Sequence, residues 1–128
     1  MSEEITEFLD LDDVLELAKK LLGDPAPVRD IGLLGSAVAR PQTTVGGEWA
    51  YPTIIDKAAA LLQSIVINHA LVDGNKRLGW VCTAVFLQIN GIDVTTISND
   101  GVYDFVYWVA STNPPLEDVV SALRLLVK

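Results

Sequence analysis

The residues with the greatest capacity for chemistry lie in one short run, at positions 69–77. The run reads His-Ala-Leu-Val-Asp-Gly-Asn-Lys-Arg and contains the only histidine of the chain, with a carboxylate, an amide and two cations close behind it. Apolar segments flank the run, so we expect a solvent-accessible polar loop between two buried elements. If Asn75 to Arg77 open the second element as a helix, its free backbone N–H groups and dipole create an anion site at the loop.

These residue types match the needs of phosphoryl chemistry on a nucleotide. That chemistry uses a base for an incoming hydroxyl, a hard oxygen ligand for Mg²⁺, and cations with N–H donors around the phosphates. His69 is the candidate base, Asp73 the candidate metal ligand, and Gly74 to Arg77 the candidate phosphate-binding stretch. Each also has a structural alternative: a packed or solvated histidine, an N-cap aspartate, a turn glycine, and an exposed pair of cations at Lys76 and Arg77.

Two other kinds of site do not fit the pattern. The GxxxxGK[ST] spacing of a P-loop is absent. A zinc site is excluded because His69 and Cys82 supply too few nitrogen and sulfur ligands. Cys82, the single cysteine, lies inside an apolar run and is expected to be a buried structural thiol.

Length and composition predict one folded domain over residues 1–128, with residues 1–10 as a frayed acidic lead-in. Half of the 128 residues are hydrophobic and 20% are charged, which excludes a disordered chain. No apolar run reaches the length of a membrane span, and the acidic N-terminus does not resemble a signal peptide, so we expect a cytoplasmic protein. The net charge of −8 argues against direct nucleic-acid binding.

The spacing of apolar residues predicts an all-α fold of five to six helices around a central pair. Asp10 and Asp13 are expected to cap the first helix, Pro52 to lie in the first turn of the central one, and Asn113 to cap the last. The expected helices cover approximately residues 10–22, 31–39, 52–69, 76–90, 102–110 and 116–127.

Residues 41–52 interrupt this helical pattern. They contain two prolines, a Gly-Gly pair and two aromatic residues, and we expect a loop or a short hairpin. The segment 92–97 is expected to form a short extended piece at most.

The run 69–77 resembles the Fic/Doc signature, HxFx(D/N)GN(G/K)R, and lysine at its eighth position is typical of the death-on-curing (Doc) branch. The likeness extends over most of the chain. Ala70 replaces a frequent proline and Leu71 replaces the phenylalanine, although Leu71 can still anchor the loop in the core. Further segments that resemble the branch lie at 29–37, 40–41, 58–62, 86–87 and 90–91.

The resemblance implies a toxin of a toxin–antitoxin pair that acts as a protein kinase. Such a kinase transfers the γ-phosphate of ATP to a serine or threonine hydroxyl of elongation factor Tu and inhibits translation. In this chain His69 would be the general base and Asp73 would hold Mg²⁺. Gly74 and Asn75 would bring the loop backbone and an amide to the phosphates. The cations that would neutralise the phosphates are Lys76 and Arg77.

The resemblance also assigns a role to residues 41–52 and a partner to the chain. The segment 41–52 would be the flap that positions the target. Self-inhibiting Fic proteins carry (S/T)xxxE(G/N), and we interpret the near match from Thr44 to Glu48 as chance. Inhibition is therefore expected from a Phd-like antitoxin, through a short disordered segment in an apolar groove over or beside the active site.

Two alternatives stay open at this point. The first is a Fic-type AMP-transferase on the same fold, since Lys76 alone does not settle which phosphate is attacked. The second is a catalytically silent module that only binds an antitoxin. All the polar side chains of the signature are present, which argues against the silent module.

Overall fold

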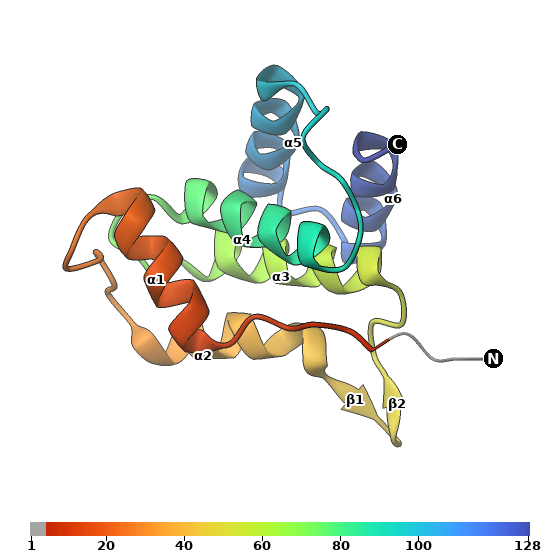
Figure 1. Ribbon diagram of the computed structural model, residues 1–128, viewed down its shortest axis with the longest axis horizontal. Coiled ribbons are helices and arrows are strands. Elements are labelled where there is room, and N and C mark those ends of the chain that lie inside the picture. The colour runs from red at the N-terminus through yellow and green to blue at the C-terminus, as the bar shows by residue number, and fades with distance from the viewer. Residues whose placement is uncertain (1–4) are drawn as a thin grey trace.

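The computed structural model describes residues 5–128, and within them helices dominate, as predicted (Figure 1). No helix in this range is both long and apolar enough to cross a bilayer. A 3-10 turn at Arg40–Gln42 and a small hairpin separate the second helix from the third. The six helices are α1 (Leu11–Leu22), α2 (Ile31–Ala39), α3 (Ile54–Asn68), α4 (Asn75–Ile89), α5 (Asn99–Thr112) and α6 (Leu116–Leu126).

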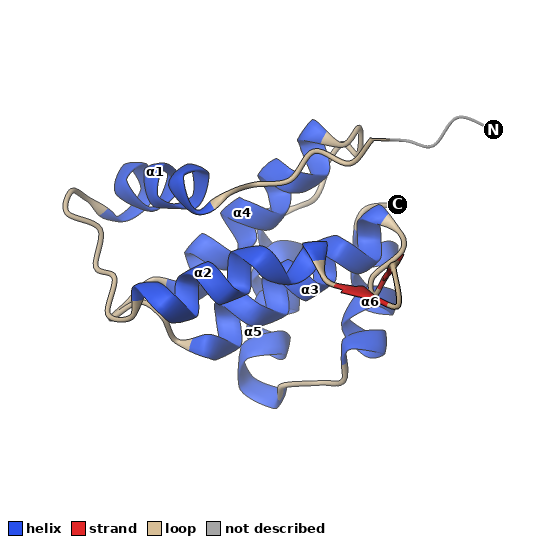
Figure 2. Ribbon diagram, turned by 90° about the horizontal axis from the view of Figure 1, so that it is seen from below, coloured by secondary structure: helices blue, strands red, loops and turns tan. Residues whose placement is uncertain are grey.

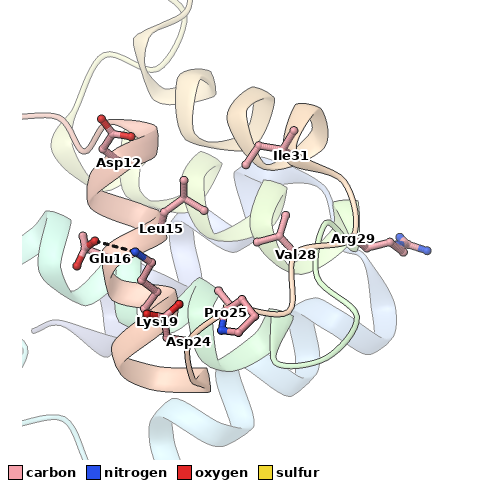
Figure 3. A pocket seen from close by; sticks show the side chains of 10 residues that line it. Asp12, Leu15, Glu16, Lys19, Asp24, Pro25, Val28, Arg29 and Ile31 are labelled. Carbon is pink, nitrogen blue, oxygen red and sulfur yellow. Dashed lines mark hydrogen bonds and ion pairs between the residues drawn. The ribbon is translucent and has the colours of Figure 1, made fainter.

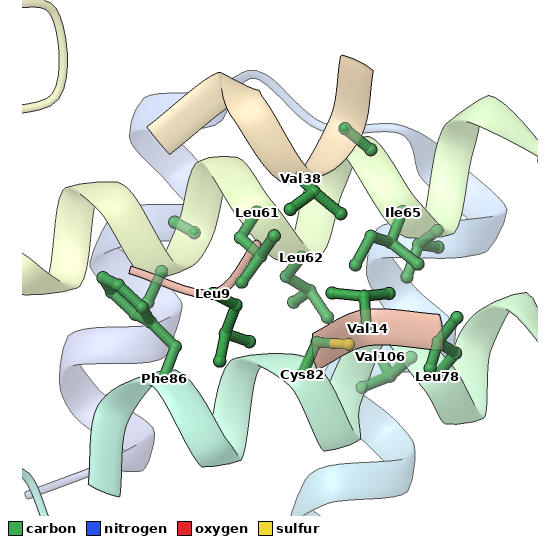
Figure 4. Packing of buried hydrophobic residues seen from close by; sticks show 14 of the residues in the cluster. Leu9, Val14, Val38, Leu61, Leu62, Ile65, Leu78, Cys82, Phe86 and Val106 are labelled. Atoms are coloured by element: carbon green, nitrogen blue, oxygen red, sulfur yellow. The ribbon is translucent and has the colours of Figure 1, made fainter. Parts of the chain in front are cut away.

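The helices α3 and α4 form the antiparallel central pair that the sequence predicts, with the other helices around them (Figures 1 and 2). Leu62, Cys82 and Phe86 are among the fully buried side chains between the two helices (Figure 4). Gly79 permits their close approach, because a Cβ at that position would lie 2.7 Å from Cγ2 of Val66. Burial also raises the pKa of the Cys82 thiol to about 12, so the expectation of a structural thiol is confirmed.

Helix capping follows the sequence at α1 and departs from it elsewhere. Asp10 and Asp13 form the expected capping box. At α3 the N-cap is Thr53, so Pro52 precedes the helix and the prediction that it lies in the first turn is wrong. Asn113 is the left-handed C-cap of α5, and the helix that follows begins after Pro115, so the prediction of Asn113 as its cap is also wrong.

The acidic lead-in is ordered over the part next to α1. The Asn90 side chain brackets Glu7, accepting from its N–H at 2.9 Å and donating to its carbonyl at 2.9 Å. Leu9 is buried, and the ring of Phe8 lies 6.1 Å from that of Phe86. The expectation of a frayed segment is therefore wrong for residues 7–10, whereas residues 1–4 lie outside the described part of the chain.

The hairpin expected within residues 41–52 is present. Strands β1 (Thr44–Val45) and β2 (Glu48–Trp49) pair antiparallel around Gly46 and Gly47, both at positive φ as a tight hairpin turn requires. The hairpin adjoins the N-terminal end of α3, and the motif follows the C-terminal end of this 15-residue helix (Figure 1). Thr43, at the base of the hairpin, and Asn68, at the end of α3, nevertheless line one cavity. The expectation of a hairpin in this segment is therefore confirmed, and its role as a flap that positions the target stays a prediction.

Candidate functional site

The polar run 69–77 forms the turn between the two central helices. His69 is the C-cap of α3 and adopts the left-handed conformation, at φ 52° and ψ 45°, while Asn75 is the first residue of α4. Both positions agree with the sequence prediction. The His69 side chain is exposed, and its imidazole forms no hydrogen bond within residues 5–128. A positive φ is uncommon for a residue with a Cβ, so other contacts must hold it.

A short extended segment at residues 27–30 holds the backbone of this turn. Val28 and Leu71 form an antiparallel bridge, and the N–H of Val72 donates to the carbonyl of Pro27 at 2.8 Å. The N–H of Arg29 donates to the Ala70 carbonyl at 2.8 Å, and its guanidinium donates to the carbonyl of His69. The loop backbone is thereby paired on the side where α3 no longer supplies partners.

Sequence reasoning missed the pairing of residues 27–30 with the motif turn, although two prolines, in and just before this segment, could have indicated it. Pro25 and Pro27 keep the chain out of a helix and favour an extended backbone that can pair with a neighbour. The same segment also forms one wall of a groove of about 740 Å³, whose other wall is α1 (Figure 3). Leu15 and Val28 are among the residues that line it, and the Arg29 side chain extends away from α1.

The Asn75 side chain ties the loop to the start of α4. Its Oδ1 accepts from the N–H of Leu71 at 3.0 Å, and its Nδ2 donates to the carbonyl of the same residue at 3.1 Å. Leu71 is itself buried, so it anchors the loop in the core as expected despite replacing a phenylalanine. The Asn75 amide is thus engaged with the loop backbone, and the expected phosphate contact at this position is left to its backbone N–H.

Gly74 lets the chain turn into α4 without a side chain in the way. It is the N-cap at φ 89°, and an added Cβ would lie 2.6 Å from Cδ2 of Leu22. No side chain caps the helix, so the expectation of Asp73 as its N-cap is wrong. One oxygen of Asp73 instead accepts from the N–H of Gly74 at 2.9 Å. The first-turn N–H groups of α4 therefore remain available to an anion.

The predicted site residues surround one cavity of about 190 Å³. Lys76 and Arg77 are exposed and form no ion pair with any acidic side chain of residues 5–128. Val66 of α3 and Ala110 of α5 supply apolar walls that sequence reasoning did not identify, because only the packing of α5 brings Ala110 here. The sequence-predicted residues at the cavity are His69, Asp73, Gly74, Asn75, Lys76 and Arg77.

The donor set at this cavity fits a nucleotide with Mg²⁺ better than a metal held by protein alone. Within residues 5–128 no three His, Cys, Asp or Glu side chains gather as a metal site. Mg²⁺ bound with substrate phosphates needs only one or two carboxylates and retains several waters. Asp73 is exposed and has one carboxylate oxygen without a partner among residues 5–128, so it can serve as that carboxylate.

An apolar groove of about 290 Å³ adjoins this cavity and shares Lys76 and Arg77 with it. Its walls come from the end of α1 and from the facing sides of α4 and α5. Tyr103 and Tyr107 lie along it with their rings stacked 5.9 Å apart, and both are exposed. Exposed aromatic residues beside cations are typical of a surface that receives another chain.

Comparison with known proteins identifies two matches. Residues 8–87, which include the whole run 69–77, match the family described as the Fic/DOC family. The chain is also 48% identical over 120 residues to a protein of Mycolicibacterium smegmatis named Toxin Doc. That alignment covers 93% of this chain and 92% of the relative.

Proposed function

This chain belongs to the Fic/Doc family, and from that premise we propose that it is a Doc-type toxin of a toxin–antitoxin pair. We propose further that it is a protein kinase which transfers the γ-phosphate of ATP to a serine or threonine hydroxyl of a translation factor, elongation factor Tu being the first candidate. The observation that carries the proposal is the single cavity lined by His69, Asp73 and the first turn of α4. This activity places the protein in the cytoplasm and makes it an inhibitor of translation.

In the proposed reaction His69 acts as the general base. The target hydroxyl oxygen bonds to the γ-phosphorus of ATP while His69 takes the hydroxyl proton, and the bond from the γ-phosphorus to the bridging oxygen breaks to release ADP. The imidazole suits this role because it is exposed and free of protein hydrogen bonds, while the carbonyl of the same residue is held by Arg29.

The start of α4 is proposed to bind the phosphates. The uncapped N–H groups of the first turn, the helix dipole, and the unpaired Lys76 and Arg77 all favour negative charge at one place. Asp73 would hold Mg²⁺, which when bound offsets the charge of the phosphate oxygens. Gly74 allows a phosphate to approach the backbone because no Cβ is present.

Transfer of labelled phosphate tests which group moves. The protein is incubated with bacterial lysate and ATP labelled at either the α- or the γ-phosphate. Label from the γ position on a target protein is the expected result, and label from the α position would replace kinase activity with AMP transfer. Asp73→Ala should lose the label in either case, because Asp73 would hold the Mg²⁺ that would offset the phosphate charge in both reactions. No label from either position would leave the antitoxin-binding module as the function.

For the partner, we propose that a Phd-like antitoxin inserts a short, initially disordered segment into the apolar groove beside the cavity. The groove is lined mainly by apolar and aromatic side chains and borders the two candidate phosphate-binding cations. A segment bound there reaches the phosphate site without any inhibitory motif in this chain. Tyr103→Arg places a charge in the groove and should prevent neutralisation by the co-expressed antitoxin while leaving label transfer unchanged. Neutralisation equal to that of the unaltered protein would contradict this docking site.

A further inference from the structure

A second polar cavity, of about 500 Å³, lies on the side of α3 that faces α2 and the 3-10 turn. No carboxylate of the described part of the chain lines it, although the full sequence has 17 acidic residues and a net charge of −8. The charge at this cavity is therefore opposite in sign to that of the chain as a whole. The residues that line it are Ser36, Ala39, Arg40, Thr43, Ser64 and Asn68.

Arg40 is held rigidly at this cavity by neutral groups. Its Nε donates to the Tyr51 hydroxyl at 2.9 Å, and its Nη1 donates to Gln63 Oε1 at 2.7 Å and to Ser64 Oγ at 2.9 Å. The guanidinium also lies 5.1 Å from the centroid of the Tyr51 ring. The same cation has no ion pair with an acidic side chain of residues 5–128.

The Nη2 edge of this guanidinium has no partner among the described residues. Within the described residues no acceptor contacts Nη2, so two of the five N–H donors of Arg40 are free. A fixed guanidinium with a free edge is well suited to an oxyanion, because little side-chain entropy is lost when the anion binds.

Neutral donors complete the cavity. Ser64 is buried, and because its oxygen accepts from a guanidinium that cannot itself accept, its hydroxyl hydrogen remains to be donated elsewhere. The side chains of Ser36 and Asn68 form no hydrogen bond with residues 5–128. One cation and three neutral donor groups thus line a cavity that contains no acid.

This cavity is separate from the one at the motif. Ser64 and Asn68 are four residues apart and share one face of α3. Val66, which lines the motif cavity, lies between them in sequence and therefore on the opposite side of the helix. An anion at Arg40 would not occupy the phosphate positions proposed at the start of α4.

We propose that this cavity is a second anion site, which binds a phosphate or carboxylate group through the free edge of Arg40. Ser36, Ser64 and Asn68 supply the further donors. A purely structural role for Arg40, as a link from the 3-10 turn to α3 and Tyr51, accounts for Nε and Nη1. It does not account for the free Nη2, the unpartnered side chains around it, or the exclusion of acids from the lining. The proposed site does not depend on the kinase proposal.

Titration of the intact protein with inorganic phosphate and, separately, with acetate tests the site, with ionic strength held constant by sodium chloride. Backbone and side-chain nuclear magnetic resonance signals of Ser36, Arg40 and Asn68 should shift and saturate with at least one of the two anions. Stronger binding of phosphate would identify a phosphate group as the ligand, and stronger binding of acetate a carboxylate. Signals of Gly74 and Arg77 report binding at the start of α4 and separate the two sites.

Variants at the cavity edge provide the decisive comparison. Asn68→Ala and Ser36→Ala each remove one donor without touching the links that Arg40 makes to Tyr51 and Gln63, and each should weaken anion binding about tenfold. Ser121→Ala, an exposed serine of α6, is the matched control and should change nothing. Arg40→Lys keeps the charge but loses the planar fork, and should weaken binding further if the variant folds.

Three results would overturn the proposal. The first is the absence of a saturable shift at the cavity with either anion. The second is binding of equal strength in Asn68→Ala, Ser36→Ala and the unaltered protein. The third is a response confined to Gly74 and Arg77, which would place all anion binding at the motif.

Discussion

The two ends of α3 use polar residues in opposite ways. At its N-terminal end the polar groups pair with one another: Thr53 and Asp56 form a capping box, and the ammonium of Lys57 donates to the carbonyls of Tyr51 and Pro52 at 2.7 and 3.0 Å. At its C-terminal end the backbone is paired, through Val28 and Leu71, but the imidazole of His69, which ends the helix, has no hydrogen-bond partner among the described residues.

This difference separates polar groups that the fold has satisfied from polar groups that remain available to a ligand. A polar group that the fold has already satisfied stabilises the protein and has little left to offer a ligand. At the motif the hydrogen bonds are made to the main chain, and they fix the turn. Within residues 5–128 the imidazole of His69 has no hydrogen bond, Lys76 and Arg77 have no ion pair, and all three residues line one cavity. The fold thus provides a rigid backbone with unpartnered side chains, as a binding site requires.

The largest effect that distinguishes the two ends is expected from His69→Ala. Loss of a general base lowers the rate of phosphate transfer by about 10²- to 10⁴-fold. The side chain makes no hydrogen bond in the described structure, so the helical circular dichroism and the unfolding midpoint should change little. Transfer of labelled phosphate and growth of expressing cells measure the activity. Growth arrest as strong as with the unaltered protein would exclude a catalytic role for this histidine.

A second comparison is offered by two asparagines at the two ends of α4. Asn75 brackets Leu71, and Asn90 brackets Glu7, each through one accepted and one donated hydrogen bond to the backbone of a single residue. Asn75→Ala removes both bonds of its bracket, and Asn90→Ala also removes a third bond, which Nδ2 donates to the Phe86 carbonyl at 2.8 Å. Each change should cost about 1–3 kcal/mol of unfolding free energy. Only Asn75→Ala should also lower transfer activity, because only that bracket fixes the motif turn.

Urea unfolding and label transfer measured on both asparagine variants make this comparison. Asn90→Ala is the matched control, since it is the same residue type in the same kind of bracket. Equal activity of the two variants at temperatures where both are folded would show that the Asn75 bracket supports stability alone.

The smallest expected effect is a pH dependence at the N-terminal end of α3. Burial lowers the pKa of Lys57, and the nearby Asp56 opposes that shift only in part. Between the folded pKa and the ordinary value of about 10.5 the unfolded chain binds more protons, so the free energy of unfolding gains a contribution that increases with pH in that window.

Lys57→Met should abolish this contribution while filling similar space. The unfolding free energy of the unaltered protein minus that of the variant is therefore expected to increase as the pH is raised toward 10.5. Urea titrations at several pH values measure it, with Lys20→Met, an exposed lysine of α1, as the control. A difference that stays constant with pH would mean that Lys57 is ionised in the folded protein to the same extent as in the unfolded chain.

The sequence was most informative where a local rule dominates. The apolar periodicity of the two central helices and the capping box of Asp10 with Asp13 depend on residues a few positions apart, and both predictions are confirmed. The prediction of a helix start was wrong where two neighbouring residues could each begin the helix, as at Pro52 and Thr53. There the side-chain hydrogen bonds of Thr53 and Asp56 set the helix start.

The hairpin of residues 41–52 shows a different limit of sequence reasoning. The segment 41–52 contains the Gly-Gly turn that a hairpin needs, and a hairpin forms there. Turn chemistry gives the shape of a segment but not its distance from the motif, which is fixed by the length and direction of α3. The segment that lies against the motif is 27–30, and its pairing with Leu71 spans 43 residues of chain.

The sequence by itself determined the helices, the buried thiol, and a polar turn between the two central helices, because spacing and residue type act locally. Only the tertiary structure decided which groups remain free to act. Arg29 and Asn75 are both polar and both near the motif, yet each is engaged with the loop backbone, while Lys76 and Arg77 are not. Whether a donor is satisfied depends on neighbours that folding brings from elsewhere in the chain, and no local pattern encodes them.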